Sequence, residues 1–198
     1  MQNSTTKVRV LTGTAMLGAV AAVLMYLEFP IPIMPAFVKL DVSELPALIA
    51  SFAYGPVSGV LVCLIKNLIK LPSTSTAAVG ELFNFVMGAL FVGVAGIVYK
   101  KNKTRKGAII GAVAGALIMA LVSLPYNYFV VYPAYVVMYH LPLEAIIGMY
   151  QAINPNVNGL LACLITFNVP FTFVKGVLDA VLCFLIYKPL SPILHGRK

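Results

Sequence analysis

The chain has 198 residues, of which 61% are hydrophobic and only 10% are charged, and it carries a net charge of +8. A water-soluble protein of this size could not bury so much apolar surface, so the composition favours an integral membrane protein. No polar stretch is long enough to form a second, water-soluble domain, and we expect residues 1–198 to form one membrane domain.

The first apolar run, about residues 8–27, is close to the ~20 residues that a helix needs to cross a bilayer. It is long for a cleavable signal, and no small-residue cleavage site follows it, so we predict a retained membrane span. Within it, Ala15 and Ala19 form a small-xxx-small pair, which lets another helix approach closely. That helix could come from the same chain or from a partner protein.

The segment from Glu28 to Asp41 contains several prolines and predicts a stiff, non-helical connection. The next apolar stretch, residues 44–71, is too long for one ordinary span, and Gly55-Pro56 interrupts it. We therefore predict two short helices, about residues 44–54 and 57–71, each shorter than the bilayer is thick. Such helices must tilt, thin the lipid or sit against other helices.

Three further apolar runs, about residues 77–99, 107–131 and 169–187, complete a predicted all-α bundle of six helices. None of the runs alternates in polarity as a strand would. The basic run KKNKTRK, residues 100–106, should be cytoplasmic because short basic loops stay inside. Two crossings between residues 44 and 71 then place the basic residues of both termini on the same, cytoplasmic side.

The net charge is therefore expected to reflect topology and contact with the anionic lipid of the bilayer, with no nucleic-acid partner. The C-terminal basic residues of this set are Lys188, Arg197 and Lys198. The predicted location is the cell membrane, the plasma membrane of a bacterium, with multiple passes.

Polar side chains lie near the outer ends of three predicted spans. They are Glu81 and Asn84 of the 77–99 run, Asn127 and Tyr128 of the 107–131 run, and Thr172 and Lys175 of the 169–187 run, whose start Asn168 could cap. Charged groups in hydrocarbon are costly and usually face an interior or a cavity. Several such groups at one depth predict a single polar cavity that opens to the outer side.

A structural role is open for each of these residues alone. Lys175 and Asp179 are four apart on one helix and could neutralise each other. Lys66 and Lys70 are expected to extend to the outer interface. Glu81 could serve as the anion of a helix N-terminus.

The residues near the predicted cavity suit a neutral, amphipathic ring compound. Phe83, Tyr128 and Phe171 favour a flat apolar ring, while asparagine and threonine favour a heterocycle edge or hydroxyl groups. A single lysine is too little for a phosphate. The sequence contains no nucleotide-binding loop, metal-ligand set or assignable catalytic triad, so we expect no enzyme, no metal and no cofactor, and transport would need energy from a partner.

Five sequence runs resemble the riboflavin-binding substrate-specific subunits (S components) of energy-coupling factor (ECF) transporters. They are FPIPIMPAFVKLDVSELPALIASFAYGPVSG, KNLIK, GELFNFVMG, IIGMYQAINPNVNGLL and FNVPFTFVKG, and the similarity covers nearly the whole chain. The resemblance implies a six-helix protein that captures riboflavin, as transported substrate, near the outer face. It also implies partners, namely an EcfT-like transmembrane coupling subunit and two cytoplasmic ATPase subunits.

The resemblance also implies a substrate site. It falls on Leu40, Asp41, Glu81, Asn84, Asn127, Thr172 and Lys175. Thr172 stands where some family members have asparagine, which would change one hydrogen bond to the ring edge. The pair Ala15 and Ala19 resembles the family's docking face for the coupling subunit. An S component for another vitamin, a self-contained secondary transporter and an intramembrane enzyme remain alternatives.

Overall fold

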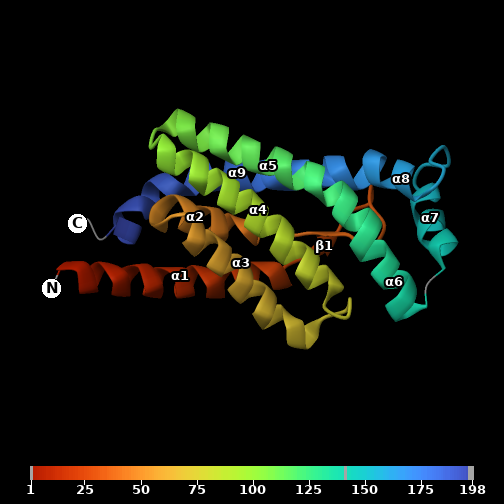
Figure 1. Ribbon diagram of the computed structural model, residues 1–198, viewed down its shortest axis with the longest axis horizontal. Coiled ribbons are helices and arrows are strands. Elements are labelled where there is room, and N and C mark those ends of the chain that lie inside the picture. Colours follow the sequence, from red (N-terminus) through yellow and green to blue (C-terminus); the bar gives the residue numbers. More distant parts are fainter. Residues whose placement is uncertain (1, 141, 196–198) are drawn as a thin grey trace.

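The computed structural model describes residues 2–140 and 142–195, and these are mostly helical. The helices are α1 (Gln2–Tyr26), α2 (Glu44–Tyr54), α3 (Pro56–Lys70), α4 (Val79–Lys101), α5 (Arg105–Tyr126), α6 (Tyr132–Tyr139), α7 (Leu143–Gln151), α8 (Leu160–Cys163) and α9 (Val169–His195). Two short strands, β1 (Phe29–Pro30) and β2 (Lys39–Leu40), pair antiparallel between α1 and α2. The longer helices run roughly along the long axis of the molecule (Figure 1).

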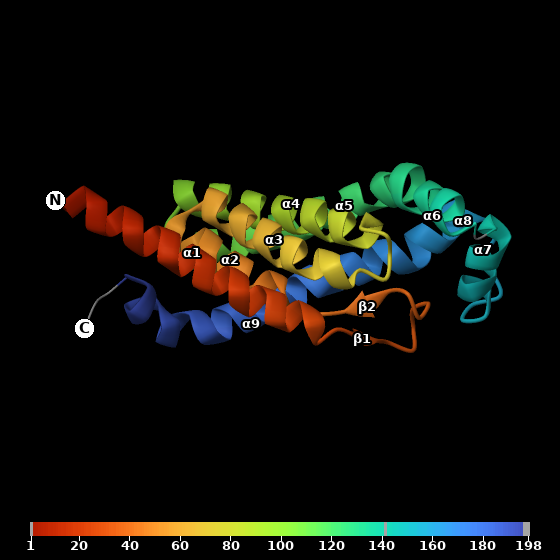
Figure 2. The ribbon, with the colours of Figure 1, turned by 90° about the horizontal axis from the view of Figure 1, so that it is seen from below.

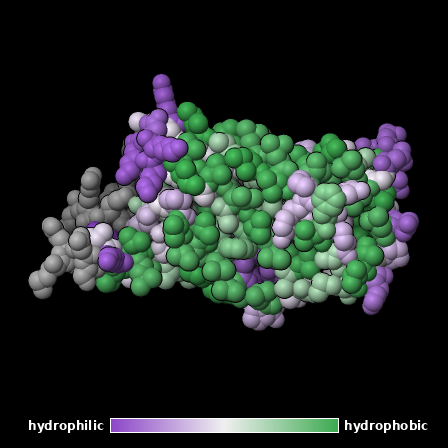
Figure 3. Space-filling model, in the orientation of Figure 1, coloured by the Kyte–Doolittle hydropathy of each residue, from purple (hydrophilic) through white to green (hydrophobic). Residues whose placement is uncertain are grey.

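Within residues 2–140 and 142–195, five helical stretches are long and apolar enough to cross a membrane. They are Thr6–Tyr26, Pro56–Ser73, Val79–Lys101, Arg105–Met138 and Leu160–Tyr187. Figure 3 shows a matching belt: hydrophobic residues cover most of the middle of this face, and hydrophilic residues gather toward both ends of the long axis. The chain is thus a multi-pass, all-α membrane protein.

The two ends of the bundle differ in composition. The start of α1, the end of α9 and the connection between α4 and α5 lie at one end, which we call the basic end because Lys7, Lys100 and Lys101 are exposed there (Figures 1 and 2). The paired strands, α6 and α7 lie toward the other, the hairpin end. Arg197 and Lys198, which were expected on the same side as Lys7, lie outside the described residues.

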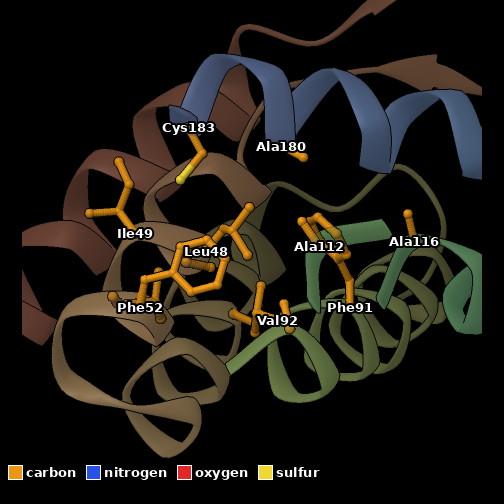
Figure 4. Packing of buried hydrophobic residues seen from close by; sticks show 14 of the residues in the cluster. Leu48, Ile49, Phe52, Phe91, Val92, Ala112, Ala116, Ala180 and Cys183 are labelled. Atoms are coloured by element: carbon orange, nitrogen blue, oxygen red, sulfur yellow. The ribbon is translucent and has the colours of Figure 1, made fainter. Parts of the chain in front are cut away.

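Helix α2 has 11 residues and rises only about 16 Å, which is too short to span a bilayer. The helix packs inside the bundle instead, where it contacts α1, α3, α4 and α9. Leu48 of α2, fully buried, lies between Cys183 of α9 and Val92 of α4 (Figure 4). Of the three arrangements open to a short helix, the structure has the one in which other helices surround it.

The last two membrane stretches differ from the sequence prediction. Helix α5 ends at Tyr126 and continues through a π-helical turn, η2 (Asn127–Val131), into α6. Helix α9 is preceded by α8 and a second π-helical turn, η3 (Leu164–Asn168), so helical structure begins at Leu160 rather than near residue 169. Asn168 therefore lies inside a continuous helical stretch, and its predicted role as an N-cap is wrong.

A proline follows each π-helical turn after one further residue, Pro133 after η2 and Pro170 after η3. Proline has no N–H to donate to the preceding turn, and its ring crowds the carbonyl there. A locally widened turn relieves that conflict without ending the helix. Both turns contribute residues to the cavity described next.

Candidate functional site

A cavity of about 170 Å³, which we call the polar cavity, lies between the helices and the connection from α1 to α2. We call that connection, residues 27–43, the first loop. The cavity is built from the last turns of α1 and α3, the starts of α2 and α4, the second half of α5, both π-helical turns, α6 and the first half of α9. Its charged and amide lining residues are Glu28, Lys39, Asp41, Glu44, Lys70, Glu81, Asn84, Asn127, Asn168, Lys175 and Asp179. Of the six polar residues predicted at one depth in three spans, all but Tyr128 line this cavity.

Six of the eight substrate-binding candidates line the polar cavity, namely Asp41, Glu81, Asn84, Asn127, Thr172 and Lys175. Leu40 and Tyr128 are absent from its described lining. Tyr128 is 39% exposed and its ring packs edge-on against Phe129, with 5.0 Å between centroids. The π-helical turn buries Asn127 and directs Tyr128 outward, so the prediction that Tyr128 forms a cavity wall is wrong.

Lys175 is held by two carboxylates from another part of the chain. Its Nζ lies 2.9 Å from Asp41 Oδ2 and 2.8 Å from Glu44 Oε2. The predicted pairing with Asp179 is not seen: neither oxygen of that fully buried carboxylate has a hydrogen-bond partner among the described residues. The side chain of Lys175 instead reaches across to the N-terminus of α2, where two acceptors lie together.

Lys66 does not extend to the outer interface as predicted. It is 0% exposed, and its Nζ donates to Glu44 Oε1 at 2.6 Å and to Ser43 Oγ at 2.5 Å. Because a buried ammonium group is costly unless it is paired, these two partners account for its position. Lys70 likewise turns inward, with Nζ 3.2 Å from Glu28 Oε1 and 4.4 Å from the centre of the Tyr26 ring.

Asp41 lies in the loop between β2 and α2. Its Oδ1 accepts hydrogen bonds from the backbone N–H of Ser43, at 2.9 Å, and from the hydroxyl of the same residue. Burial alone would raise the pKa of Asp41, but the charges of Lys175 and Lys66 and the hydrogen bonds outweigh burial and hold that pKa well below its usual range. The carboxylate is therefore ionised and gives Lys175 a permanent negative partner.

The α4 side of the cavity is fixed by hydroxyl and amide groups. Glu81 Oε2 accepts from Thr74 Oγ1 at 2.7 Å and from Thr76 Oγ1 at 2.9 Å. Asn84 Oδ1 accepts from Asn67 Nδ2 at 3.4 Å. The Glu81 side chain is thus positioned by the α3–α4 connection and retains a free lone pair for hydroxyl groups of a ligand.

Aromatic residues close the hairpin end of the cavity, and they are not among the site residues predicted from the sequence. Phe37 of the first loop packs edge-on against Tyr132, Tyr135 and Tyr150, with centroid distances of 6.2–6.4 Å. The Tyr150 hydroxyl, whose pKa burial raises to about 12, donates to Asn168 Oδ1 at 2.7 Å. Asn168 Nδ2 in turn donates to Tyr132 Oη at 3.2 Å, so the first loop rests on a hydrogen-bonded aromatic cluster.

Comparison with known proteins identifies relatives over nearly the whole chain. Residues 9–187 match the family model described as "ECF transporter, substrate-specific component". The chain is 33% identical over 180 residues to the riboflavin transporter RibU of Staphylococcus aureus (strain TCH60), covering 91% of this chain and 89% of that protein. It is 33% identical over 195 residues to the riboflavin transporter FmnP of Bacillus subtilis (strain 168), covering 97% of each.

A solved structure described as "Structure and mechanism of the S component of a bacterial ECF transporter" has the same fold, with a TM-score of 0.73 and 32% identity over 98% of this chain and 99% of that one. The resemblance predicted from sequence is confirmed. Since the family and these relatives are transport proteins, the prediction that the chain is not an enzyme is also confirmed.

Proposed function

The chain belongs to the substrate-specific components of ECF transporters, and from this membership we propose that it binds riboflavin in the polar cavity as the capturing subunit of a vitamin uptake system in the cell membrane. The named relatives at 33% identity are riboflavin transporters. The observation that carries the proposal is Lys175: a cationic donor, held by two carboxylates, that lines a cavity with amide, hydroxyl and aromatic groups as well as charged ones.

These groups suit the two parts of riboflavin. The isoalloxazine ring is flat and largely apolar, with carbonyl and nitrogen acceptors along one edge. Lys175 donates to a carbonyl on that edge, Asn127 and Thr172 complete the hydrogen bonds there, and Phe171 contacts the ring face. The ribityl hydroxyls face the opposite side of the cavity.

On that side, Glu81 and Asn84 supply an acceptor and an amide for the ribityl chain, whereas Asp41 stays beside Lys175. The first loop acts as a lid. The volume of about 170 Å³ is smaller than the roughly 300 to 1,000 Å³ common for small-molecule sites, so entry of the vitamin requires this loop to move outward. Phe37, at the aromatic cluster, is the residue that holds the loop down.

Energy for transport comes from partners in this proposal. Ala15 and Ala19 are exposed on α1, whereas Gly18 and Ala22, on the other face of the helix, are buried in the bundle. A small, exposed face supports close docking of a helix from a transmembrane coupling subunit, which in turn is driven by two cytoplasmic ATPase subunits. The basic end, with the start of α1 and the end of α9, then faces the cytoplasm.

The purified protein in lipid nanodiscs is expected to bind one riboflavin per chain and to quench its fluorescence. Titration with riboflavin, and with thiamine as the matched control vitamin, measures this directly. Binding of thiamine without riboflavin would favour an S component for another vitamin. Riboflavin uptake into liposomes that contain this chain alone would favour a self-contained secondary transporter.

A further inference from the structure

We propose that Lys66, on α3, is a positioning residue of the flavin site, which acts through two carboxylates to hold the ammonium group of Lys175 in the cavity wall. The inference rests on the proposed function, because it concerns the lysine that meets riboflavin. Lys66 is itself fully buried and is not part of the described lining of the polar cavity, so it acts on the ligand only through the residues that hold Lys175.

The contacts form a closed arrangement of alternating charges. Glu44 places Oε1 2.6 Å from Lys66 Nζ and Oε2 2.8 Å from Lys175 Nζ. Ser43 Oγ accepts from Lys66 Nζ and donates to Asp41 Oδ1, which leaves Asp41 Oδ2 for Lys175. Lys66 therefore contacts Glu44 directly and reaches Asp41 through the Ser43 hydroxyl, while each carboxylate turns its other oxygen toward Lys175.

The charge count gives Lys66 its importance. Asp41 and Glu44 balance Lys66 and Lys175, so the four groups are neutral together. Without Lys66, one ammonium would face two buried carboxylates. Breaking one member out of a buried ion network leaves an uncompensated charge and lets the remaining groups move. Lys175 would then sit deeper between the carboxylates and donate less well to the ligand.

Replacing Lys66 with methionine, which keeps the unbranched apolar part of the side chain, is expected to weaken riboflavin binding about 10- to 100-fold. The visible absorption band of bound riboflavin should shift in the same direction as in Lys175→Met, because both changes weaken the same hydrogen bond to the ring. Lys101→Met, an identical change at an exposed residue of the basic end, is expected to leave both readouts unchanged.

If Lys66→Met does not fold, Lys66→Gln keeps a neutral donor for Ser43 and Glu44 but removes the charge, and it is expected to show the same weakening and the same spectral shift. Wild-type affinity and an unshifted spectrum in either folded variant, with only a lowered unfolding temperature, would mean a purely structural lysine and would overturn the inference alone. Absence of riboflavin binding by the wild-type protein would overturn the proposed function, and the inference with it.

Discussion

Lys175→Met is expected to weaken riboflavin binding by about 100-fold or more. Hydrogen bonds from charged donors contribute about 1.5 to 3 kcal/mol, which corresponds to roughly 10- to 100-fold in affinity. The variant loses this donor and also leaves Asp41 and Glu44 beside the ligand with one cation fewer. Fluorescence quenching in nanodiscs measures the dissociation constant, and thermal unfolding shows whether the variant is folded.

Methionine keeps the unbranched apolar part of the lysine side chain and lacks the terminal ammonium, so the change tests that group rather than packing. Lys101→Met serves again as the matched control. A folded Lys175→Met protein that binds riboflavin as tightly as the wild type would remove this residue from the site.

Gly115→Leu is expected to cause the largest loss of folded protein. A side chain at Gly115 would begin 2.4 Å from the carbonyl oxygen of Phe91, and one at Gly111 would begin 2.7 Å from that of Ala95. Helices α4 and α5 thus touch through their backbones along a row of small residues, as membrane helices do when dispersion contacts and close approach hold them together.

Because the clash is with backbone, the two helices must separate. Helix α4 carries Glu81 and Asn84 of the polar cavity, and Asn127 follows directly after α5. Overpacking typically costs about 1 to 3 kcal/mol, and a backbone clash lies at or above the upper end. Thermal unfolding in detergent and the monodisperse fraction after purification measure the effect.

The matched control is Gly148→Leu on α7. A side chain at Gly148 meets nothing within 4 Å, and its backbone has ordinary helical geometry. It should unfold at nearly the same temperature as the wild type. Equal unfolding temperatures for Gly115→Leu and Gly148→Leu would show that α4 and α5 do not depend on their close contact.

The apolar helices could be predicted from the sequence because the bilayer sets their length and composition. The break between α2 and α3 was also readable, since Gly55 takes a positive φ of 106° and Pro56 suits the first turn of a helix. The start of the last helical stretch could not be predicted from the sequence. A helix cap contributes about 1 kcal/mol, and Asn168 gains more by hydrogen bonding to Tyr132 and Tyr150 inside the bundle.

The candidate site could be predicted in its members but not in its pairings. Charged residues in membrane spans are few, because a charge in hydrocarbon costs free energy, and this made Glu81 and Lys175 site candidates. Helical spacing offers only local partners, which is why Asp179 was chosen for Lys175. The actual partners arrive through the tertiary fold, where α2 begins inside the bundle and brings Glu44 to both Lys66 and Lys175.

A signal for this arrangement does exist in the sequence. Lys66 and Lys175 both lie within apolar stretches, and two buried lysines require at least two carboxylates. Asp179 alone does not suffice, which points to the acidic residues at the start of the short helix, residues 41–44. Tyr128 was placed on the cavity side on the assumption of a regular helix, and the π-helical turn that Pro133 favours directs it outward.

The most direct test of the account is an experimental structure of the protein bound to riboflavin in lipid. The expected result is a flavin ring in the polar cavity, with a ring carbonyl about 2.7–3.2 Å from Lys175 Nζ and the ribityl chain against Glu81 and Asn84. Riboflavin bound at the basic end would contradict the account. Riboflavin outside the bundle, with Lys175 in contact with Asp41 and Glu44 but not with the vitamin, would also contradict it.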